Sequence, residues 1–164
     1  LFSNILYRNS FVEEVIKMKL NCGLYISRIR QINGRIMNKI LSEKNISAFN
    51  GEQGRILHVL WEEDGISIKE LSFKTGLAVS TLTKMIDRME EANLIKRIPD
   101  KKDRRKILIK LTEYTNSLKG VYDEISQKMT DYSYDGFSEN EIETMERLLK
   151  KMLNNVEKAE RENK

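Results

Sequence analysis

The sequence predicts a mostly α-helical fold that carries one small β-hairpin, an α+β arrangement with long helices at both ends. Composition is the first indication, because the 164 residues include one proline and eight glycines, and 40% of them are apolar. This composition favours long helices over a β-sandwich or barrel. Periodicity is the second, since apolar residues follow helical spacing along most of the chain and alternate strictly only over residues 107–111.

The N-terminal part is expected to form one long helix from Phe11 to about Glu43, with Gly23 and Gly34 as the places where it could kink. Its apolar residues recur at intervals of three to four. Turn-forming residues at 45–51 interrupt this pattern. A short apolar helix is expected to follow over residues 52–63.

Residues 66–97 predict two short helices joined by a tight turn. The first runs from about Ile68 to Lys74 and ends at Thr75-Gly76, where glycine can take the left-handed conformation that terminates helices. The second runs from about Val79 to Ala92 and has apolar residues along one face, at Leu82, Met85, Ile86 and Met89. Two helices joined in this way form a helix-turn-helix unit.

The opposite face of the second helix is small and polar near its N-terminus and cationic one turn later. Hydroxyl groups and cations can approach base edges and phosphates closely. The candidate DNA contacts are Ser80, Thr81, Thr83, Lys84 and Arg88. An ordinary solvated helix face is the alternative reading of the same pattern.

Two β-type runs, residues 94–98 and 107–111, predict an antiparallel hairpin. The alternation places Ile107, Ile109 and Leu111 toward the helices. The opposite face of this strand, with Lys106 and Lys110, is expected to face water. The eight residues PDKKDRRK then form the tip, which carries five cations.

After Thr112 the chain is expected to return to helix until a break at residues 132–140. A final helix begins with Ser138 as N-cap and Glu141 three residues later, the spacing of a capping box. The apolar stripes of the terminal helices exceed what so small a helix-turn-helix unit can cover. Pairing with another chain is therefore expected.

Charge is concentrated in the middle of the chain. Residues 66–112 carry a net charge of +6, residues 1–65 carry +2 and residues 113–164 carry −4. A basic region between near-neutral and acidic ones is typical of a protein in which one region meets a polyanion.

The stretch IKELSFKTGLAVSTLTKMIDRMEEANLIKR, the Asp-x-Arg motif at Asp103 and Arg105, and the final LTE resemble the MarR family of bacterial transcription regulators. The resemblance implies winged helix-turn-helix proteins that act as homodimers on palindromic double-stranded operators, most often as repressors. It assigns residues 51–112 to the DNA-binding domain and residues 1–50 and 113–164 to dimerisation. Ala78 departs from the family pattern, which has a capping serine or similar residue before the second helix.

For the wing, the resemblance implies that Arg105 enters the minor groove while Asp103 orients its guanidinium. A narrow minor groove concentrates negative potential and suits a planar guanidinium. The other tip cations, including Lys101, Lys102 and Arg104, are expected to contribute general phosphate attraction.

The family resemblance also implies a small-molecule effector pocket. The polar and aromatic candidates for it are Tyr25, Arg30, His58, Trp61 and Tyr122. Cys22 is a candidate peroxide sensor by the same resemblance, and a small residue at a helix contact is the alternative reading of that position. A reactive thiol requires a depressed pKa, which the sequence does not reveal.

Two other classes of protein remain as alternatives. A winged-helix module could use its basic tip to bind an acidic protein surface. An enzyme is not expected, because the sequence contains no phosphate-binding glycine loop and no zinc motif. The single cysteine and the single histidine predict no metal centre, and no cofactor is expected. The lone cysteine favours a cytoplasmic protein, and no apolar run approaches the length that a membrane span requires.

Overall fold

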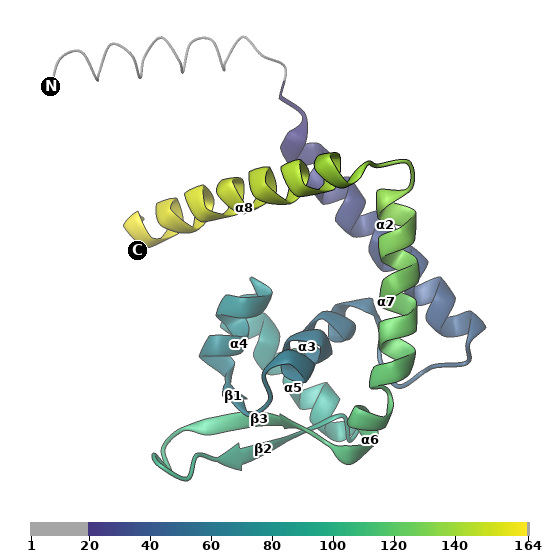
Figure 1. Cartoon of the computed structure of the whole chain (residues 1–164). Coiled ribbons are helices and arrows are strands. Elements are labelled where there is room, and N and C mark those ends of the chain that lie inside the picture. The colour runs from purple at the N-terminus through teal and green to yellow at the C-terminus, as the bar shows by residue number, and fades with distance from the viewer. Residues whose placement is uncertain (1–19, 164) are drawn as a thin grey trace, which may run out of the picture. The chain divides into compact units, whose positions relative to one another are not determined.

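The computed structural model describes residues 20–163 and divides after Lys119 into two units. It confirms the mostly helical fold with a small antiparallel sheet (Figure 1). The first unit contains α2 (Cys22–Glu43), α3 (Gly51–Glu62), β1 (Ile66–Ser67), α4 (Ile68–Thr75), α5 (Val79–Glu91), β2 (Ile95–Pro99), β3 (Ile107–Leu111) and α6 (Glu113–Ser117). The other helices are α7 (Lys119–Tyr134), which crosses the boundary, and α8 (Glu139–Glu162).

The long N-terminal helix was predicted to be continuous, and this is wrong at Leu20 and Asn21, which are not helical. The helix begins at Cys22, after Asn21, whose side chain makes no capping hydrogen bond. The predicted part before Leu20 lies outside the described residues. Gly34 lies within α2, which continues through it to Glu43.

Two helices of the first unit begin with side-chain caps: α3, and α4, which is the first helix of the helix-turn-helix. Asn50 begins α3 by accepting hydrogen bonds from the backbone N–H groups of Glu52 and Gln53, at 3.1 and 3.0 Å. Ser67 begins α4, and the Glu70 carboxylate accepts from both the backbone N–H and the hydroxyl of Ser67, at 2.8 and 2.6 Å. At its C-terminus α4 ends at Gly76 with φ of 66°, as predicted for the turn.

The core of the first unit lies between these helices and the sheet. The apolar stripe predicted for the second helix of the motif is confirmed at Leu82, Ile86 and Met89 of α5, which are completely buried. Met85, the fourth residue of the predicted stripe, is only partly buried. They share this core with fully buried residues of α3 and α4, namely Ile56, Leu57, Leu60 and Leu71. Burial of this kind contributes roughly 1.5–3 kcal/mol per large apolar side chain.

The sheet has three strands in the order β1-β3-β2, all antiparallel. The hairpin of β2 and β3 was predicted, and its register joins Ile95 to Leu111 and Pro99 to Ile107. Strand β1 was not predicted, because two residues are too few to show an alternating pattern. It pairs Ile66 with Ile109 and so attaches the start of α4 to the hairpin.

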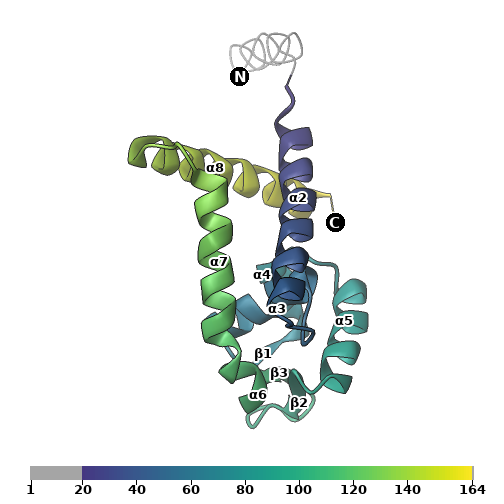
Figure 2. The same ribbon diagram turned by 90° about the vertical axis from the view of Figure 1, so that its right-hand side faces the viewer.

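One core prediction for the hairpin is wrong. Ile109 and Leu111 are buried, but Ile107 is 45% exposed. It lies opposite Pro99 at the far end of the ribbon, which projects past α4 and β1 in Figure 1. In Figure 2, which is turned by 90°, the same ribbon lies to the lower left of α5. The helices therefore cover the base of the hairpin, and its outer end is free for another contact.

The chain leaves the hairpin through a short polar connection. The Thr112 side chain accepts from the Thr115 backbone N–H and caps α6. The buried Thr115 hydroxyl donates to the Leu94 carbonyl at 2.6 Å. Helix α6 ends at Ser117, so the single helix predicted after Thr112 is divided into α6 and α7.

The second unit begins α8 at the predicted N-cap. The Glu141 carboxylate accepts from the Ser138 backbone N–H at 2.9 Å and from its hydroxyl at 2.6 Å. None of the α8 residues is buried, although the helix is strongly amphipathic. Its largest exposed apolar residues are Leu148, Leu149, Met152, Leu153 and Val156. No helix within residues 20–163 is long and apolar enough to cross a membrane.

Candidate nucleic-acid interface

Helix α5 presents a polar face on the side away from the core. Ser80, Thr81, Lys84 and Arg88 are all exposed. Neither Lys84 nor Arg88 forms an ion pair among the described residues, so both charges are available to an external anion. The structure thus brings the predicted α5 contacts together on one accessible helix, whose N-terminal end would meet base edges if it lay in a major groove.

The N-terminus of α5 has no side-chain cap. Ala78 occupies the cap position and is followed directly by Val79, the first helical residue. A polar side chain at this position would contribute about 1 kcal/mol to the stability of the protein. The chain therefore has an unusually apolar start to this helix, and Val79 is 44% exposed.

Thr83 differs from the other hydroxyl residues of the face. Its hydroxyl donates to the Val79 carbonyl at 2.9 Å, within the same helix. The donor that sequence reasoning assigned to a base is thus already used, although the oxygen remains able to accept.

A residue that the sequence reasoning did not single out connects α5 to the hairpin. The guanidinium of Arg97, on β2, binds Asp87 at 2.5 Å and also binds Glu90, both on α5. The Arg97 backbone N–H donates to the Glu90 carboxylate at 3.0 Å. Burial opposes the charge, but the hydrogen bonds to the two carboxylates outweigh it and raise the pKa of Arg97 above its ordinary value.

Part of this arrangement, which we call the Arg97 clamp, is visible in the sequence. Asp87 and Glu90 are three residues apart and therefore adjacent on one helix face. The cation that meets them is ten and seven residues away in sequence, respectively. The turn between α5 and β2 brings Arg97 to the two carboxylates. Local spacing therefore did not reveal the ion pairs.

The wing, residues 99–106, is shaped by two aspartates. The Asp100 carboxylate accepts from the Lys102 backbone N–H at 2.8 Å, and the Asp100 N–H donates to the Lys106 carbonyl at 2.9 Å. The Lys106 N–H donates to the Asp103 carbonyl at 2.8 Å. These hydrogen bonds fix the backbone of the turn between the two paired strands.

Arg105 and Asp103 form the ion pair that the family resemblance implies. One carboxylate oxygen of Asp103 accepts from the backbone N–H of Arg105 at 3.1 Å and from its Nε at 3.3 Å. The Arg105 side chain is nevertheless 93% exposed. The contact at Nε leaves both terminal nitrogens of the guanidinium free to donate outward. Lys101, Lys102 and Arg104 are exposed on the same tip.

The candidate effector residues lie on three helices, α2, α3 and α7. Tyr25 and Arg30 are exposed on α2, and Arg30 forms an ion pair with Glu52 at 3.3 Å. His58 is exposed on α3, and Trp61 is partly buried there. Tyr122 lies on α7 in the second unit, where burial raises its pKa.

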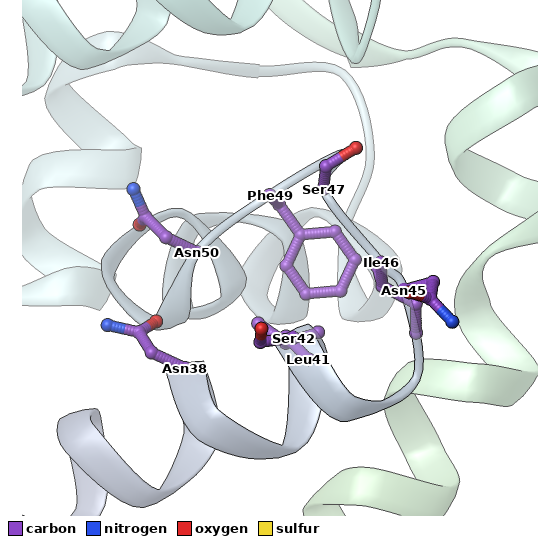
Figure 3. Close-up of a pocket in the computed structure, with 8 residues that line it drawn as sticks. All are labelled: Asn38, Leu41, Ser42, Asn45, Ile46, Ser47, Phe49 and Asn50. Carbon is purple, nitrogen blue, oxygen red and sulfur yellow. The ribbon is translucent and has the colours of Figure 1, made fainter.

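A pocket of about 530 Å³ lies instead between the end of α2 and the start of α3 (Figure 3). Buried Leu41 and Phe49 form its apolar part, and Asn38, Ser42 and Asn50 contribute polar groups. The side-chain oxygen of Asn38 is already bonded to the Gly51 N–H at 2.8 Å. None of the five candidate effector residues lines this pocket.

Cys22 is exposed at the first position of α2. Its proposed peroxide sensitivity stays a prediction. Among residues 20–163, no group of three or more His, Cys, Asp or Glu side chains is arranged to hold a metal ion.

The helix-turn-helix, the antiparallel hairpin and the basic tip define a winged helix-turn-helix protein of the DNA-binding class. Residues 49–107 match the family model described as MarR family. The HTH-type transcriptional regulator MgrA of Staphylococcus aureus is 28% identical over 138 residues, which are 84% of this chain and 90% of that protein. Residues 49–107 therefore resemble the DNA-binding part of MarR-family transcriptional regulators, and the similarity to MgrA extends over most of the chain.

Solved structures agree with this assignment. A mutant MarR from E. coli in complex with operator DNA is similar with a TM-score of 0.71 and 25% identity, covering 82% of this chain and 94% of that one. A MarR protein from Peptoclostridium difficile has a TM-score of 0.77 at 22% identity, covering 87% and 91%. At that identity the second similarity concerns the fold alone.

Proposed function

We propose that the chain is a sequence-specific repressor of transcription that binds a palindromic operator as a homodimer. The observation that carries this proposal is the exposed polar face of α5 beside a wing whose Arg105 is held by Asp103 and remains 93% exposed. Each protomer would thus place α5 in the major groove and the wing in the minor groove.

In the major groove, α5 would direct its N-terminal residues at base edges. Ser80 and Thr81 are short enough to permit close approach, and Lys84 lies one turn further along. Lys and Arg side chains at this distance reach either guanine or the phosphates. The clamp of Arg97 on Asp87 and Glu90 would hold the helix at a fixed angle to the wing.

In the minor groove, Arg105 would insert its guanidinium while Asp103 limits the orientations available to it. A narrow groove has an enhanced negative potential that attracts arginine. The remaining tip cations, Lys101, Lys102 and Arg104, would neutralise phosphates on either side, which makes binding strongly dependent on salt.

The homodimer would be formed by residues 1–50 and 113–164. Exposed apolar side chains on α2, such as Leu24 and Ile29, and those on α8 support this. Contiguous apolar faces of this kind mark interaction sites in soluble proteins. A symmetric dimer would bind a palindromic operator, because two-fold symmetry in the protein selects two-fold symmetry in the DNA site.

Repression and its relief by a small-molecule effector complete the proposal. Their support is the resemblance of residues 49–107 to the MarR family. The candidate effector contacts remain Tyr25, Arg30, His58, Trp61 and Tyr122. A reporter gene behind the bound operator tests the sign: expression should rise when the protein is deleted and fall when it is restored.

Selection of bound duplexes from a random pool tests the DNA-binding proposal. The expected result is a palindrome whose half-sites are about one helical turn apart, roughly 10 bp. Binding without enrichment of any sequence would overturn it. A winged-helix protein-interaction module would be favoured if no sequence is enriched and the protein also binds acidic polypeptides tightly. In that case scrambled DNA should fail to displace the polypeptide.

A further inference from the structure

The start of α5 carries apolar groups where a DNA-binding helix ordinarily carries polar ones. Ala78 provides no cap, and Val79 follows it with 44% of its surface exposed. Neither residue contributes to the core, which is formed on this helix by Leu82, Ile86 and Met89. Burial within the chain therefore does not account for the isopropyl group of Val79.

Thr83 extends the same apolar feature. It lies four residues after Val79, so the two side chains are neighbours on one flank of the helix. Its hydroxyl is directed back to the Val79 carbonyl, at 2.9 Å. A threonine that bonds to its own helix in this way directs its oxygen toward the backbone and leaves its methyl group to meet the surroundings.

The major groove offers one apolar group to such a surface. Thymine carries a C5 methyl there, and no other base has one. Threonine methyls and small aliphatic side chains are the groups that contact it. N-terminal residues of a recognition helix are the ones that reach base edges.

We infer that Val79 and the methyl group of Thr83 together read thymine methyl groups in each half-site. This inference rests on the proposed function and adds a specificity to it. The polar residues of the helix, Ser80 and Lys84, lie on a different part of its surface. The half-site should therefore contain thymine at one or two fixed positions facing the start of α5.

Deleting single methyl groups on either side of the contact tests the inference. In the selected operator, each thymine is replaced in turn by deoxyuridine, which lacks only the methyl. Affinity of the unaltered protein should fall about three- to fourfold at one or two positions, the effect expected for one buried methyl. The Thr83→Ser variant, which also lacks only a methyl, should lose this sensitivity at one of them, and Val79→Ala should lose it at the same or the adjacent one.

Two variants serve as controls. Thr130→Ser removes the same methyl from α7, where the exposed Thr130 likewise donates its hydroxyl to the carbonyl four residues earlier, that of Ser126, at 3.1 Å, and it should leave the deoxyuridine effect unaltered. Thr83→Val keeps the methyl and removes the hydroxyl, so its sensitivity to deoxyuridine should persist. Helical circular dichroism and thermal melting confirm that each variant is folded.

The opposite pattern would overturn the inference. If Thr83→Ser binds like the unaltered protein and Thr83→Val loses affinity, the hydroxyl reads the base. If no thymine is sensitive although the operator is bound specifically, the inference fails while the proposed function stands. Failure to enrich any duplex would overturn the proposed function and the inference with it.

Discussion

Arg105 differs from the other tip cations in one respect. Lys101, Lys102 and Arg104 are exposed side chains without a carboxylate partner among residues 20–163, whereas Asp103 holds Arg105 at both its backbone N–H and its Nε. A fixed guanidinium loses less conformational entropy on binding than a free one. Equal charge therefore does not imply equal contribution to DNA binding.

Replacing Arg105 by Ala should weaken operator binding more than replacing Arg104 by Ala. We expect a loss of roughly 1–3 kcal/mol and relaxed specificity for Arg105→Ala. Arg104→Ala should weaken all duplexes alike and reduce the salt slope by about 1. Fluorescence anisotropy at several salt concentrations measures both, and equal losses for the two variants would contradict the assigned role of Arg105.

Asp103 provides a test in which two effects have opposite signs. Removing a negative charge from a basic tip should strengthen DNA binding if only net charge matters. We expect Asp103→Ala to weaken specific binding instead, because Arg105 loses its orienting partner. Operator titration decides, and tighter specific binding by this variant would show that orientation is unimportant.

The Asp103–Arg105 pair was expected from the family resemblance, and the structure contains it. Contacts between distant elements were not shown by local patterns in the sequence. Arg97 was missed because its partners lie on another element, and Ile107 was wrongly placed in the core because alternation assigns a face but not the end of the sheet. The use of the Thr83 hydroxyl depends on a rotamer that the sequence does not show.

Among the secondary-structure elements, α5 and β2 are joined by more than the turn between them. The Arg97 clamp holds a strand of the hairpin against the helix proposed to read DNA. Its side chain is 30% exposed, so solvent screens it only in part. The clamp thus links the position of the wing to that of the helix.

We expect Arg97→Ala to lower the free energy of unfolding by about 1–2 kcal/mol, discounted for the exposure of its partners. Operator affinity should fall as well, since Arg97 no longer fixes the hairpin against α5. Urea denaturation and anisotropy measure the two effects, and Lys96→Ala, an exposed neighbour, is the control. An unchanged stability would show that the clamp contributes nothing.

The capping boxes predict a dependence on pH. Hydrogen bonds from the Ser67 side chain and backbone hold the pKa of Glu70 below its ordinary value of 4.5. A depressed pKa contributes stability that is present above 4.5 and is lost as pH falls through the lower, folded value. The advantage of the unaltered protein over Glu70→Gln in urea denaturation should therefore shrink below pH 4.5, and a constant difference down to pH 2 would contradict this.

Helices with apolar periodicity were predicted well because the period extends over several turns. α4 and α5 agree with expectation to within one residue at each end. The interruptions at Leu20–Asn21 and at Leu118 were missed, since neither contains glycine or proline. β1 was missed because pairing with β3, rather than any local pattern, makes it a strand.

The positive charge and the exposed apolar side chains of α8 lie in different parts of the chain. The basic residues are concentrated in 66–112, while α8 leaves five large apolar side chains exposed. A helix with this pattern is rarely stable in solution without a covering surface. A second copy is the occupant that we propose.

Substitution of Leu153 by Asp should therefore weaken the dimer and, with it, operator binding. Asn154→Asp introduces the same carboxylate at the next position, which is polar and exposed, and should leave both unaltered. Sedimentation equilibrium reports the mass and anisotropy the affinity. A Leu153→Asp protein that remains dimeric would remove α8 at this position from the proposed interface.

The most direct test of the account is a chemical footprint on the selected duplex, with one probe for guanine N7 in the major groove and hydroxyl radicals for the sugars that line the minor groove. A dimer that contacts both grooves should give two protected major-groove segments about one helical turn apart, with flanking minor-groove protection that disappears in Arg105→Ala. Protection in a single groove, or a pattern without two-fold symmetry, would contradict it.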